Sequence, residues 1–321
     1  MDNHTVCIVI AAYNAQATIA RAIRSALAEP EVTEVVVVDD ASSDGTVEAA
    51  LMCDDGTRRL KVLVQPVNRG PSAARNVAIA NSTSAWIGIL DADDFLLPGR
   101  TAGLLAYGEN ADMIADDLWQ VPETAVEGPR KSLLGDALEG PRLVGFQEFV
   151  LSNVTGRGSD RKELGFIKPL MRREFLAEHG IRYQEHMRLG EDFELYARSL
   201  ALGARLVLVP PQGYVSVVRP NSLSGTHSET DLQILRDCGV QLLSELGISR
   251  EDREALRRHA RSVDCRLQWR LLIRAVKERN TQAALAAFRR PHPVPAYLIE
   301  RLVEQLYLRT FGRILALKRA G

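Results

Sequence analysis

Three carboxylates stand within four residues at Asp91-Ala92-Asp93-Asp94, directly after the apolar run from Trp86 to Leu90. The run predicts a buried strand, and open α/β sheets bind ligands and hard cations at the carboxyl edge of such strands. Carboxylates this close repel one another, and a divalent ion that holds a phosphate-bearing ligand relieves the repulsion. Taken alone, the cluster could instead be an acidic turn that caps the following segment.

Three earlier apolar runs end in polar or small residues in the same way. The runs span residues 6–10, 35–38 and 60–64, and the segments that follow them span 11–14, 39–46 and 68–76. A helical pattern comes after each segment, and Gly70-Pro71 is typical of a helix start. Strands that are apolar throughout and alternate with helices predict a mostly parallel sheet covered on both faces.

Five of these segments, taken in order, resemble family 2 inverting glycosyltransferases with the GT-A fold. They are Ala11–Asn14, Val38–Thr46, Asn68–Asn76, Leu90–Asp94 and Gly190–Asp192. The resemblance covers residues 5 to 220 and is closest to the exopolysaccharide glucosyltransferases of succinoglycan-type assembly. It implies an α/β nucleotide-sugar-binding domain over residues 1–228, with the nucleotide half in 1–117 and the acceptor half in 118–228. A basic α-helical region, 229–321, follows.

The family pattern implies a UDP-sugar donor, most simply UDP-glucose, bound along these strand ends. Ala11 and Tyr13 follow the first strand, where the aromatic face of Tyr13 can stack on the base. Asp40 can accept the N3 proton of uracil, which cytosine lacks. Arg75 suits the donor's oxyanions, and Arg69 is a weaker candidate for the same contact. Capping of the next helix is the alternative for Asp40, and for Asp39, Ser43 and Asp44 it is the simpler interpretation.

The acidic motifs take the metal and the proton in the resembled family. In that pattern Asp91 contacts the ribose, and Asp93 binds a Mg²⁺ or Mn²⁺ ion that bridges the two phosphates. Asp94 either shares this ion or turns away. Asp192 is the predicted general base for the acceptor hydroxyl, and Glu191 helps to place the acceptor or to orient Asp192. A helix start alone also favours acidic residues at these two positions.

The segment after the last predicted strand, 205–209, supplies further candidates. Arg219 and the hydroxyls of Ser222 and Ser224 could close over the diphosphate, and His227 could be a late metal ligand. A loop histidine without a role is the alternative for His227. Between residues 117 and 166 the pattern fades, and only 147–151 predicts a short helix. We expect this irregular stretch to shape the acceptor side.

Charge is distributed unevenly along the chain. From Ser249 to Gly321 there are 17 Lys and Arg against 7 Asp and Glu, whereas residues 1–248 hold 23 against 34. The last helical segment sets leucines among arginines, a pattern that suits an interfacial helix beside anionic lipid. A solvated helical layer or a homodimer contact fits the same pattern. No aromatic residues alternate with basic ones as in nucleic-acid-binding strands, so we expect no nucleic-acid partner.

Composition is compatible with an enzyme at the inner face of the cell membrane. No apolar stretch approaches the roughly 20 residues that span a bilayer, and residues 1–4 lack the features of a signal peptide. The four cysteines form no CxxC pair, so we expect reduced thiols in the cytoplasm. A lipid-linked oligosaccharide is the acceptor that the resemblance implies.

Two functions of other classes also fit the acidic strand ends. A sugar-phosphate nucleotidyltransferase would need a Gly-rich basic loop after the first strand, and residues 11–17 contain neither Gly nor Lys. A non-catalytic scaffold could retain the fold, although the complete set of Asp40, Asp93 and Asp192 argues against it. A nicotinamide dehydrogenase is disfavoured because GxGxxG is missing after the first strand.

Overall fold

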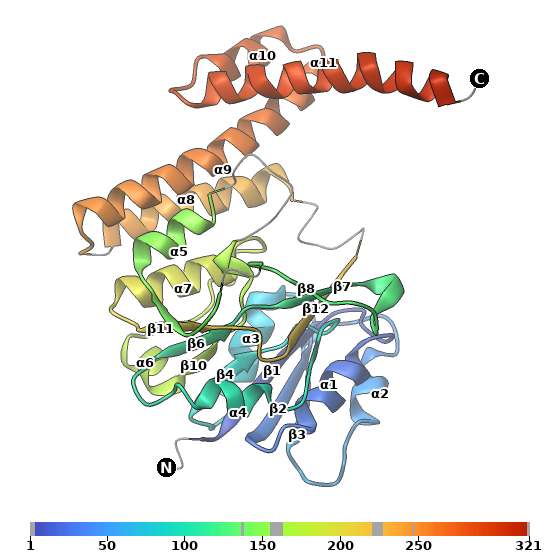
Figure 1. The fold of residues 1–321 in the computed structure, drawn as a ribbon, viewed down its shortest axis with the longest axis vertical. Coiled ribbons are helices and arrows are strands. Elements are labelled where there is room, and N and C mark those ends of the chain that lie inside the picture. Colours follow the sequence, from blue (N-terminus) through green and yellow to red (C-terminus); the bar gives the residue numbers. More distant parts are fainter. Residues whose placement is uncertain (1–3, 136–137, 155–162, 220–226, 246, 320–321) are drawn as a thin grey trace.

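An eight-stranded sheet forms the centre of the molecule (Figure 1). The structure is a computed structural model that describes residues 4–135, 138–154, 163–219, 227–245 and 247–319. The strand order of the sheet is β3-β2-β1-β4-β10-β6-β11-β9. The strands are β1 (Val6–Ala12), β2 (Val32–Asp39), β3 (Leu60–Val64), β4 (Trp86–Ile89), β6 (Met113–Asp116), β9 (Arg142–Val144), β10 (Leu170–Arg172) and β11 (Leu206–Val209).

The strand directions confirm the predicted mostly parallel sheet. β1 runs parallel to both β2 and β4, β2 runs parallel to β3, and β6 runs parallel to β11. β10 is antiparallel to β4 and β6, and the edge strand β9 is antiparallel to β11. Parallel neighbours require crossover connections, which the helices between the strands supply.

Helices cover both faces of this sheet, which explains why the strands are apolar throughout. Cys7 and Val9 of β1 pack in one core together with Ala74 of α3. Ile8 on the same strand faces the other way and packs with Ile23 of α1, because successive side chains of a strand alternate between faces. The helices of this half are α1 (Ile19–Leu27), α2 (Thr46–Leu51), α3 (Pro71–Ala80) and α4 (Arg100–Leu105).

A second, four-stranded sheet lies beside the first in the order β5-β12-β7-β8. Its strands are β5 (Phe95–Leu96), β7 (Trp119–Pro122), β8 (Lys131–Ser132) and β12 (Tyr214–Val218). The expectation of an irregular stretch over residues 117–166 is therefore wrong in part. β7 and β8 are short, and β7 pairs with the distant β12, so no local pattern reveals them. The short helix predicted at 147–151 is confirmed as α5 (Phe146–Ser152).

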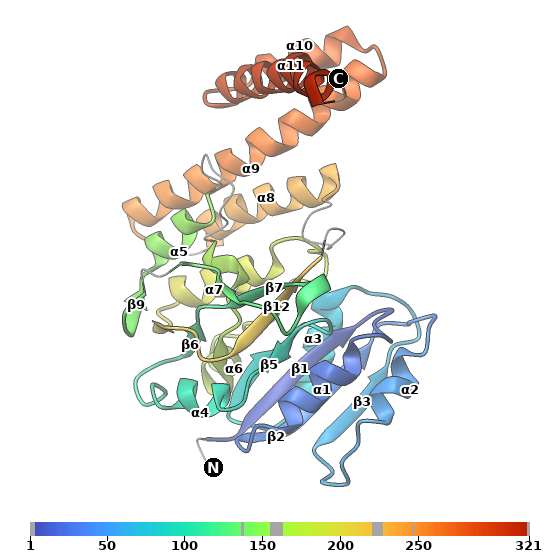
Figure 2. The ribbon, with the colours of Figure 1, turned by 45° about the vertical axis from the view of Figure 1, so that its right-hand side comes forward.

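The C-terminal helices stack on α5 and on α7 (Glu191–Ala201) (Figure 2). They follow α6 (Arg173–Glu178) and α7, and are α8 (Glu229–Glu245), α9 (Arg250–Lys277), α10 (Thr281–Phe288) and α11 (Val294–Arg319). Leu235 of α8 and Leu256 of α9 share one core with Phe193 of α7. The predicted boundary at 229 thus marks the change to helical structure, while packing continues across it.

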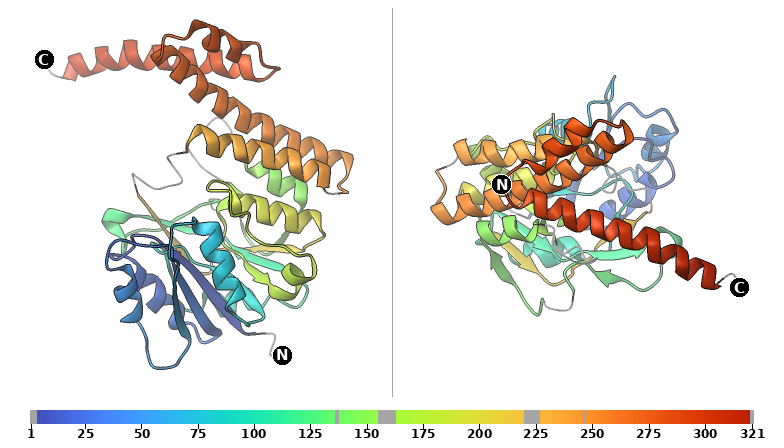
Figure 3. Two further views of the ribbon diagram at one scale, coloured as in Figure 1. Left: turned by 180° about the vertical axis from the view of Figure 1, so that it is seen from behind. Right: turned by 90° about the horizontal axis from the view of Figure 1, so that it is seen from above.

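The last two helices form a separate small core with the end of α9. Cys265 and Leu272 of α9 pack with Ala287 of α10 and with Val294 and Leu298 of α11. α11 then extends beyond the rest of the molecule, as the two views of Figure 3 show. Among the described residues, no helix is long and apolar enough to cross a membrane.

Candidate active site

The ends of neighbouring strands bring several predicted segments to one edge of the sheet. β1 and β2 are in parallel register, so that Ala12 lies opposite Asp39, and β4 pairs with the other side of β1. Tyr13, Asp40 and Asp91 each follow one of these strands within two residues. The sheet itself therefore gathers them, as the parallel arrangement predicted.

Two carboxylates from motifs about 100 residues apart in the sequence meet at two buried cations. Lys168 Nζ lies 2.7 Å from Asp192 Oδ2 and 3.1 Å from Asp91 Oδ2. Arg75 Nη2 lies 3.0 Å from Asp91 Oδ1, and its Nη1 lies 3.6 Å from Asp192 Oδ1. Asp91 and Asp192, which belong to separate sequence motifs, are thus held side by side by Lys168 and Arg75.

These charges stabilise one another against the cost of burial. Burial would raise the pKa of Asp91, but the charges of Lys168 and Arg75 lower that pKa to about 2. Burial also opposes the charged forms of Lys168 and Arg75, yet the neighbouring carboxylates, Asp192 first, raise the pKa of both. All three groups remain ionised near neutral pH, so their attraction holds the arrangement together.

Two further side chains orient this network. Glu191 Oε1 accepts a hydrogen bond from Arg75 Nη1 at 2.8 Å. The hydroxyl of Tyr183 donates to Asp192 Oδ1 at 3.1 Å, and burial together with Asp192 raises the pKa of Tyr183 well above its usual value. Tyr183 therefore stays protonated and remains a donor. Both oxygens of Asp192 accept bonds from the protein, which fixes the orientation of its carboxylate.

The start of α7 presents Glu191 and Asp192 to the site. Gly190 precedes the helix with φ +73°, a backbone conformation that favours glycine. A Cβ on Gly190 would also lie 2.5 Å from Leu235 Cδ1 of α8. The positive φ favours glycine, and any larger residue here would also require the side chain of Leu235 to move, so the turn into α7 accounts for Gly190 before Glu191.

Asp40 holds the loop that begins α3. Its Oδ1 accepts the backbone N–H of Arg69 at 2.7 Å, and its Oδ2 accepts the backbone N–H of Gly70 at 2.7 Å. Gly70 has φ +90° and Pro71 is the first residue of the helix, as the sequence predicted. Asp40 therefore links the end of β2 to the helix that carries Arg75. Its predicted contact with uracil is not tested by these bonds.

Asp93 is the most exposed carboxylate of the acidic cluster, with 37% of its side chain accessible. Its nearest cation is Arg219, whose Nη1 lies 3.6 Å from Asp93 Oδ2. Burial and the charge of Asp91 raise the pKa of Asp93 despite Arg219. A carboxylate that remains accessible and is incompletely balanced by positive charge is suited to receive a cation.

Asp94 points into the protein instead. Its Oδ2 accepts a hydrogen bond from the Tyr214 hydroxyl at 2.9 Å, and its Oδ1 accepts the Val217 backbone N–H at 2.8 Å. Burial, followed by the charges of Asp91 and Asp93, raises the pKa of Asp94 well above its usual value. This geometry favours the alternative in which Asp94 turns away from the metal and joins the two sheets through β12.

The donor set at Asp93 suits a divalent ion only in combination with a phosphate ligand. Within the described part of the chain, no cluster of three or more His, Cys, Asp or Glu side chains could hold a metal. One carboxylate leaves most positions of an octahedral Mg²⁺ or Mn²⁺ shell to water and to substrate oxygens, the usual pattern for Mg²⁺ bound with phosphates. The residues present therefore fit a metal that arrives with the donor.

The remaining predicted residues fall into three situations. Ala11 lies within β1 opposite Val38, and Tyr13 just beyond the strand is 54% exposed, as a stacking surface must be. Arg219 also pairs with Glu123, at 3.3 Å from its Nε. His227 is half-buried just before α8, and its predicted metal contact stays a prediction. The predicted hydroxyls of Ser222 and Ser224 lie outside the described residues.

The two arginines of the third motif have different surroundings. Arg75 is only 6% exposed and faces carboxylates, which favours a role in positioning Asp91 over direct contact with the donor. Arg69 is half-exposed and pairs with Glu185 at 2.6 Å, away from this network. The sequence also assigned Asp44 to capping, and its Oδ1 indeed accepts the backbone N–H of Thr46 at 3.1 Å, where α2 begins.

Three residues of the site were missed by the sequence analysis. Lys168, Tyr183 and Tyr214 contribute the bonds that hold Asp91, Asp192 and Asp94. None of them belongs to a recognisable motif. The only available signal for Lys168 was a lone cation between Ile167 and Pro169 just before a strand, which is too common to single out.

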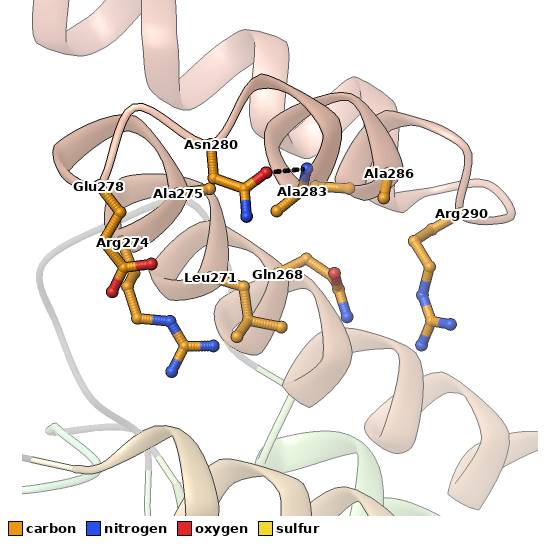
Figure 4. A pocket seen from close by; sticks show the side chains of 10 residues that line it. Gln268, Leu271, Arg274, Ala275, Glu278, Asn280, Ala283, Ala286 and Arg290 are labelled. Atoms are coloured by element: carbon orange, nitrogen blue, oxygen red, sulfur yellow. Dashed lines mark hydrogen bonds between the residues drawn. The ribbon is translucent and has the colours of Figure 1, made fainter.

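A cavity of about 440 Å³ lies elsewhere, between α9 and α10 (Figure 4). Alanines of α10 form one wall, and Arg274 and Arg290 lie toward its two ends. Arg274 pairs with Glu229 at 2.6 Å, and Arg290 pairs with Asp264 at 3.3 Å. No predicted site residue lines this cavity, and we assign it no part in the chemistry.

Comparison with known proteins agrees with the geometry. Residues 7–153 match Glycosyl transferase family 2. The chain is 45% identical over 294 residues to the succinoglycan biosynthesis protein ExoU of Rhizobium meliloti, covering 91% of this chain and 85% of the relative. It is 38% identical over 224 residues to the succinoglycan biosynthesis protein ExoO of the same organism, covering 68% and 62%.

Solved structures share the fold at low sequence identity. The S. aureus protein TarS (residues 1–349) in complex with UDP-GlcNAc superposes with a TM-score of 0.63 at 17% identity, covering 87% of this chain and 89% of that one. The mannosyltransferase PcManGT from Pyrobaculum calidifontis, in complex with GDP-Man and Mn²⁺, gives 0.58 at 18%, covering 94% and 87%. Together with the sequence match to ExoU, the predicted resemblance is confirmed: this chain belongs to glycosyl transferase family 2.

Proposed function

We propose that this glycosyltransferase transfers glucose from UDP-glucose to a hydroxyl of a lipid-linked oligosaccharide during assembly of a succinoglycan-type exopolysaccharide. The transfer inverts the anomeric centre and gives a β-glycosidic bond, at the inner face of the cell membrane. Similarity to two succinoglycan biosynthesis proteins supports the pathway, and a structural neighbour in complex with UDP-GlcNAc supports a UDP-sugar donor. Family membership favours this function over a sugar-phosphate nucleotidyltransferase.

The observation that carries the proposal is the pairing of Asp91 with Asp192 through Lys168 and Arg75. This pairing joins the strand-end cluster, where the UDP-sugar donor would bind, to the start of α7, where the acceptor hydroxyl would bind. An inverting transfer needs a carboxylate on the acceptor side within reach of the donor's anomeric carbon. A scaffold has no need to hold these two carboxylates side by side.

On the donor side, the exposed ring of Tyr13 stacks on the uracil, and Ala11 borders the base. Asp40 accepts the N3 proton of uracil while its backbone bonds fix the 69–70 loop. Asp91 receives the ribose hydroxyls, and Arg75 positions Asp91 from behind. Arg219 lies beside Asp93 and is partly exposed, so its guanidinium is suited to bind the diphosphate.

On the acceptor side, Asp192 takes the proton as the acceptor hydroxyl attacks the anomeric carbon. Lys168 and Tyr183 hold its carboxylate in place, and Glu191 completes the network through Arg75. The bond from the anomeric carbon to UDP breaks on the opposite side of the sugar, so a single displacement inverts the centre. A divalent metal bound at Asp93 would neutralise charge on the departing diphosphate.

A direct assay tests this proposal. The protein is incubated with a panel of UDP-sugars and a lipid-linked oligosaccharide, and the product is examined by mass spectrometry and by the anomeric coupling constant. We expect glucose to be transferred with β stereochemistry and turnover to stop in EDTA. Undiminished turnover in EDTA would contradict the proposed metal dependence, and an α-linked product would contradict the single displacement. If no donor releases UDP, the result would favour the non-catalytic scaffold.

The metal can be tested separately at Asp93. Asp93→Asn keeps the size of the side chain but removes the charge, and we expect Mn²⁺ to bind weakly to either protein alone. UDP should increase Mn²⁺ affinity in the original protein and fail to do so in the variant, as read from Mn²⁺ electron paramagnetic resonance. Asp94→Asn is the matched control, because Asp94 bonds to Tyr214 and Val217 inside the protein.

A further inference from the structure

The first turn of α11 is anchored to the helices beneath it. Val294 and Leu298 are buried against Leu272 of α9 and Ala287 of α10. Beyond Leu298 the helix extends away from the body of the molecule (Figures 1 and 3). The anchored start gives the following turns a fixed direction.

The following turns expose large apolar side chains on one face. We call this set the α11 stripe: Ile299, Leu302, Val303, Leu306 and Tyr307, which are 55%, 43%, 60%, 67% and 61% exposed. Their spacing of three and four residues places them on one side of a helix. Arg301 and Glu304 lie on the other side and pair with each other at 2.6 Å, and one exposed leucine, Leu308 at 54%, lies on that side with them. Exposure of this much contiguous apolar surface marks a site of interaction.

The residues that follow in the sequence distinguish lipid from a second helix. The positions seven residues after Leu302 and Leu306 are Arg309 and Arg313, and residues 305–321 contain four Lys or Arg and no Asp or Glu. A coiled pair in the register of Leu302 and Leu306 would place these two arginines in its apolar seam. An anionic bilayer surface instead accepts apolar side chains and attracts the adjacent cations.

We infer that the α11 stripe docks on an anionic lipid surface and holds the enzyme beside its acceptor, an inference that rests on the proposed lipid-linked substrate. α11 then lies along the membrane, because the described part of the chain contains no helix that could cross one. The charged pair of Arg301 and Glu304 remains toward water.

The test replaces three stripe residues in the full-length protein. Ile299→Gln, Leu302→Gln and Val303→Gln are combined, and sedimentation is measured with vesicles of phosphatidylcholine alone or with phosphatidylglycerol added. We expect the original protein to bind only the anionic vesicles, with affinity that falls in high salt, and the triple variant to bind them at least about tenfold more weakly. Leu51→Gln with Met52→Gln, at exposed positions at the C-terminal end of α2, is the matched control and should bind normally.

Three companion measurements separate the outcomes. Circular dichroism checks that the triple variant is folded, and a chymotryptic fragment pattern identical to that of the original protein checks its tertiary structure. Release of UDP from UDP-glucose in solution without vesicles should be unchanged, since the stripe lies far along the chain from Asp192. If neither protein releases UDP yet vesicle binding differs as expected, the proposed function fails and the docking surface stands.

The oligomeric state provides the opposing result. If the stripe is covered by a second copy, the original protein will be a dimer in lipid-free buffer by light scattering and the triple variant a monomer. That outcome, or equal binding of the original protein and the triple variant to anionic vesicles, would overturn the assignment to lipid.

Discussion

The strand-end site and the C-terminal helices place their charges in opposite surroundings. In the α/β region, Arg100 and Asp116 pair at 2.8 Å with side chains only 1% and 0% exposed. In α11, Arg301 and Glu304 pair at 2.6 Å with side chains 39% and 46% exposed. The first pair is buried and each of its charges is compensated by the other, whereas the second pair stays in water on a helix that exposes apolar residues. Chemistry is thus built from compensated charges in one region, and surface attachment from exposed residues in the other.

The largest expected effect is on Asp192, the centre of the buried network. Asp192→Asn keeps the shape but cannot take a proton, so sugar transfer should fall by roughly 10²- to 10⁴-fold, the usual range for loss of a general base. Donor affinity should change little. Single-turnover transfer and UDP titration measure the two quantities.

Glu191→Gln is the matched control for Asp192→Asn, since Glu191 contacts the same network through Arg75. A fully active Asp192→Asn beside an inactive Glu191→Gln would show that the base is the neighbouring carboxylate. Loss of donor affinity in Asp192→Asn would instead show that the variant has disturbed Asp91 through Lys168.

The contrast in burial predicts a contrast in stability. Asp116→Ala removes the partner of buried Arg100 and the acceptor of backbone N–H groups at Gln212 and Gly213, so it should cost about 3–5 kcal/mol of unfolding free energy. Glu304→Ala in the exposed pair should cost less than about 1 kcal/mol. Urea unfolding measures the free energy of unfolding of both variants. Equal losses would contradict the expectation that the buried pair stabilises the fold more than the exposed pair.

The junction between the regions should respond to mild acid. His259 of α9 stacks on Phe193 of α7 with ring centroids 4.1 Å apart, and burial lowers the pKa of His259 to about 3 from 6.5. Between pH 6.5 and pH 3, His259 therefore binds a proton in the unfolded chain and stays neutral in the folded chain. The stability due to neutral His259 is present above pH 6.5 and is lost as pH falls toward 3, by about 2 kcal/mol at pH 5.

Measuring the unfolding free energy at several pH values from 7 to 5 tests this contribution. His259→Phe should flatten the pH dependence whatever its absolute stability, because Phe does not titrate. His179→Asn, at an exposed position after α6, should leave the pH dependence unchanged. An unchanged slope in His259→Phe would show that other groups control the acid response.

The smallest expected effect is on donor affinity. Asp40→Asn replaces one carboxylate oxygen by a donor, which weakens both the predicted uracil contact and the bond to Gly70, so UDP affinity should fall about tenfold. Asp44→Asn weakens the bonds of Asp44 to Thr46 at the start of α2 and to the backbone of Gln16, and it should leave UDP affinity unchanged. Isothermal titration with UDP measures the affinity of each variant. Equal UDP affinities for Asp40→Asn and Asp44→Asn would show that Asp40 does not recognise the base.

Most of the larger sheet could be predicted because its strands carry their own signal. Apolar runs such as Val35–Val38 are buried on both faces and end at one edge, so the motifs that follow are gathered by topology alone. The smaller sheet could not be predicted, since β7 and β8 form only through pairing with distant β12 and with each other. A two-residue strand has no period to detect.

The residues of the site that follow strand ends could be predicted. The residues that compensate a charge brought next to them by the fold could not. Asp91 and Asp192 stand in recognisable motifs, but the role of Lys168 depends on the fold, which brings the partly exposed Asp91 and the largely buried Asp192 to the same cation. The inward turn of Asp94 likewise depends on Tyr214, which is 120 residues away in the chain. Such compensation is a property of the folded structure.

The shared core of α7, α8 and the first half of α9 determines how this enzyme can be recombined with its relatives. A chimera joined at Glu229 would replace Leu235 and Leu256, which pack with Phe193 one residue after Asp192. Such a hybrid would acquire a mismatched wall directly behind its catalytic helix. A junction near Leu271 would leave that wall intact and exchange α10 and α11. Cys265 would have to be exchanged with them, because it packs in the same core as Leu272 and Leu298. Attachment could then be exchanged between enzymes as a portable module, with the original transfer chemistry retained.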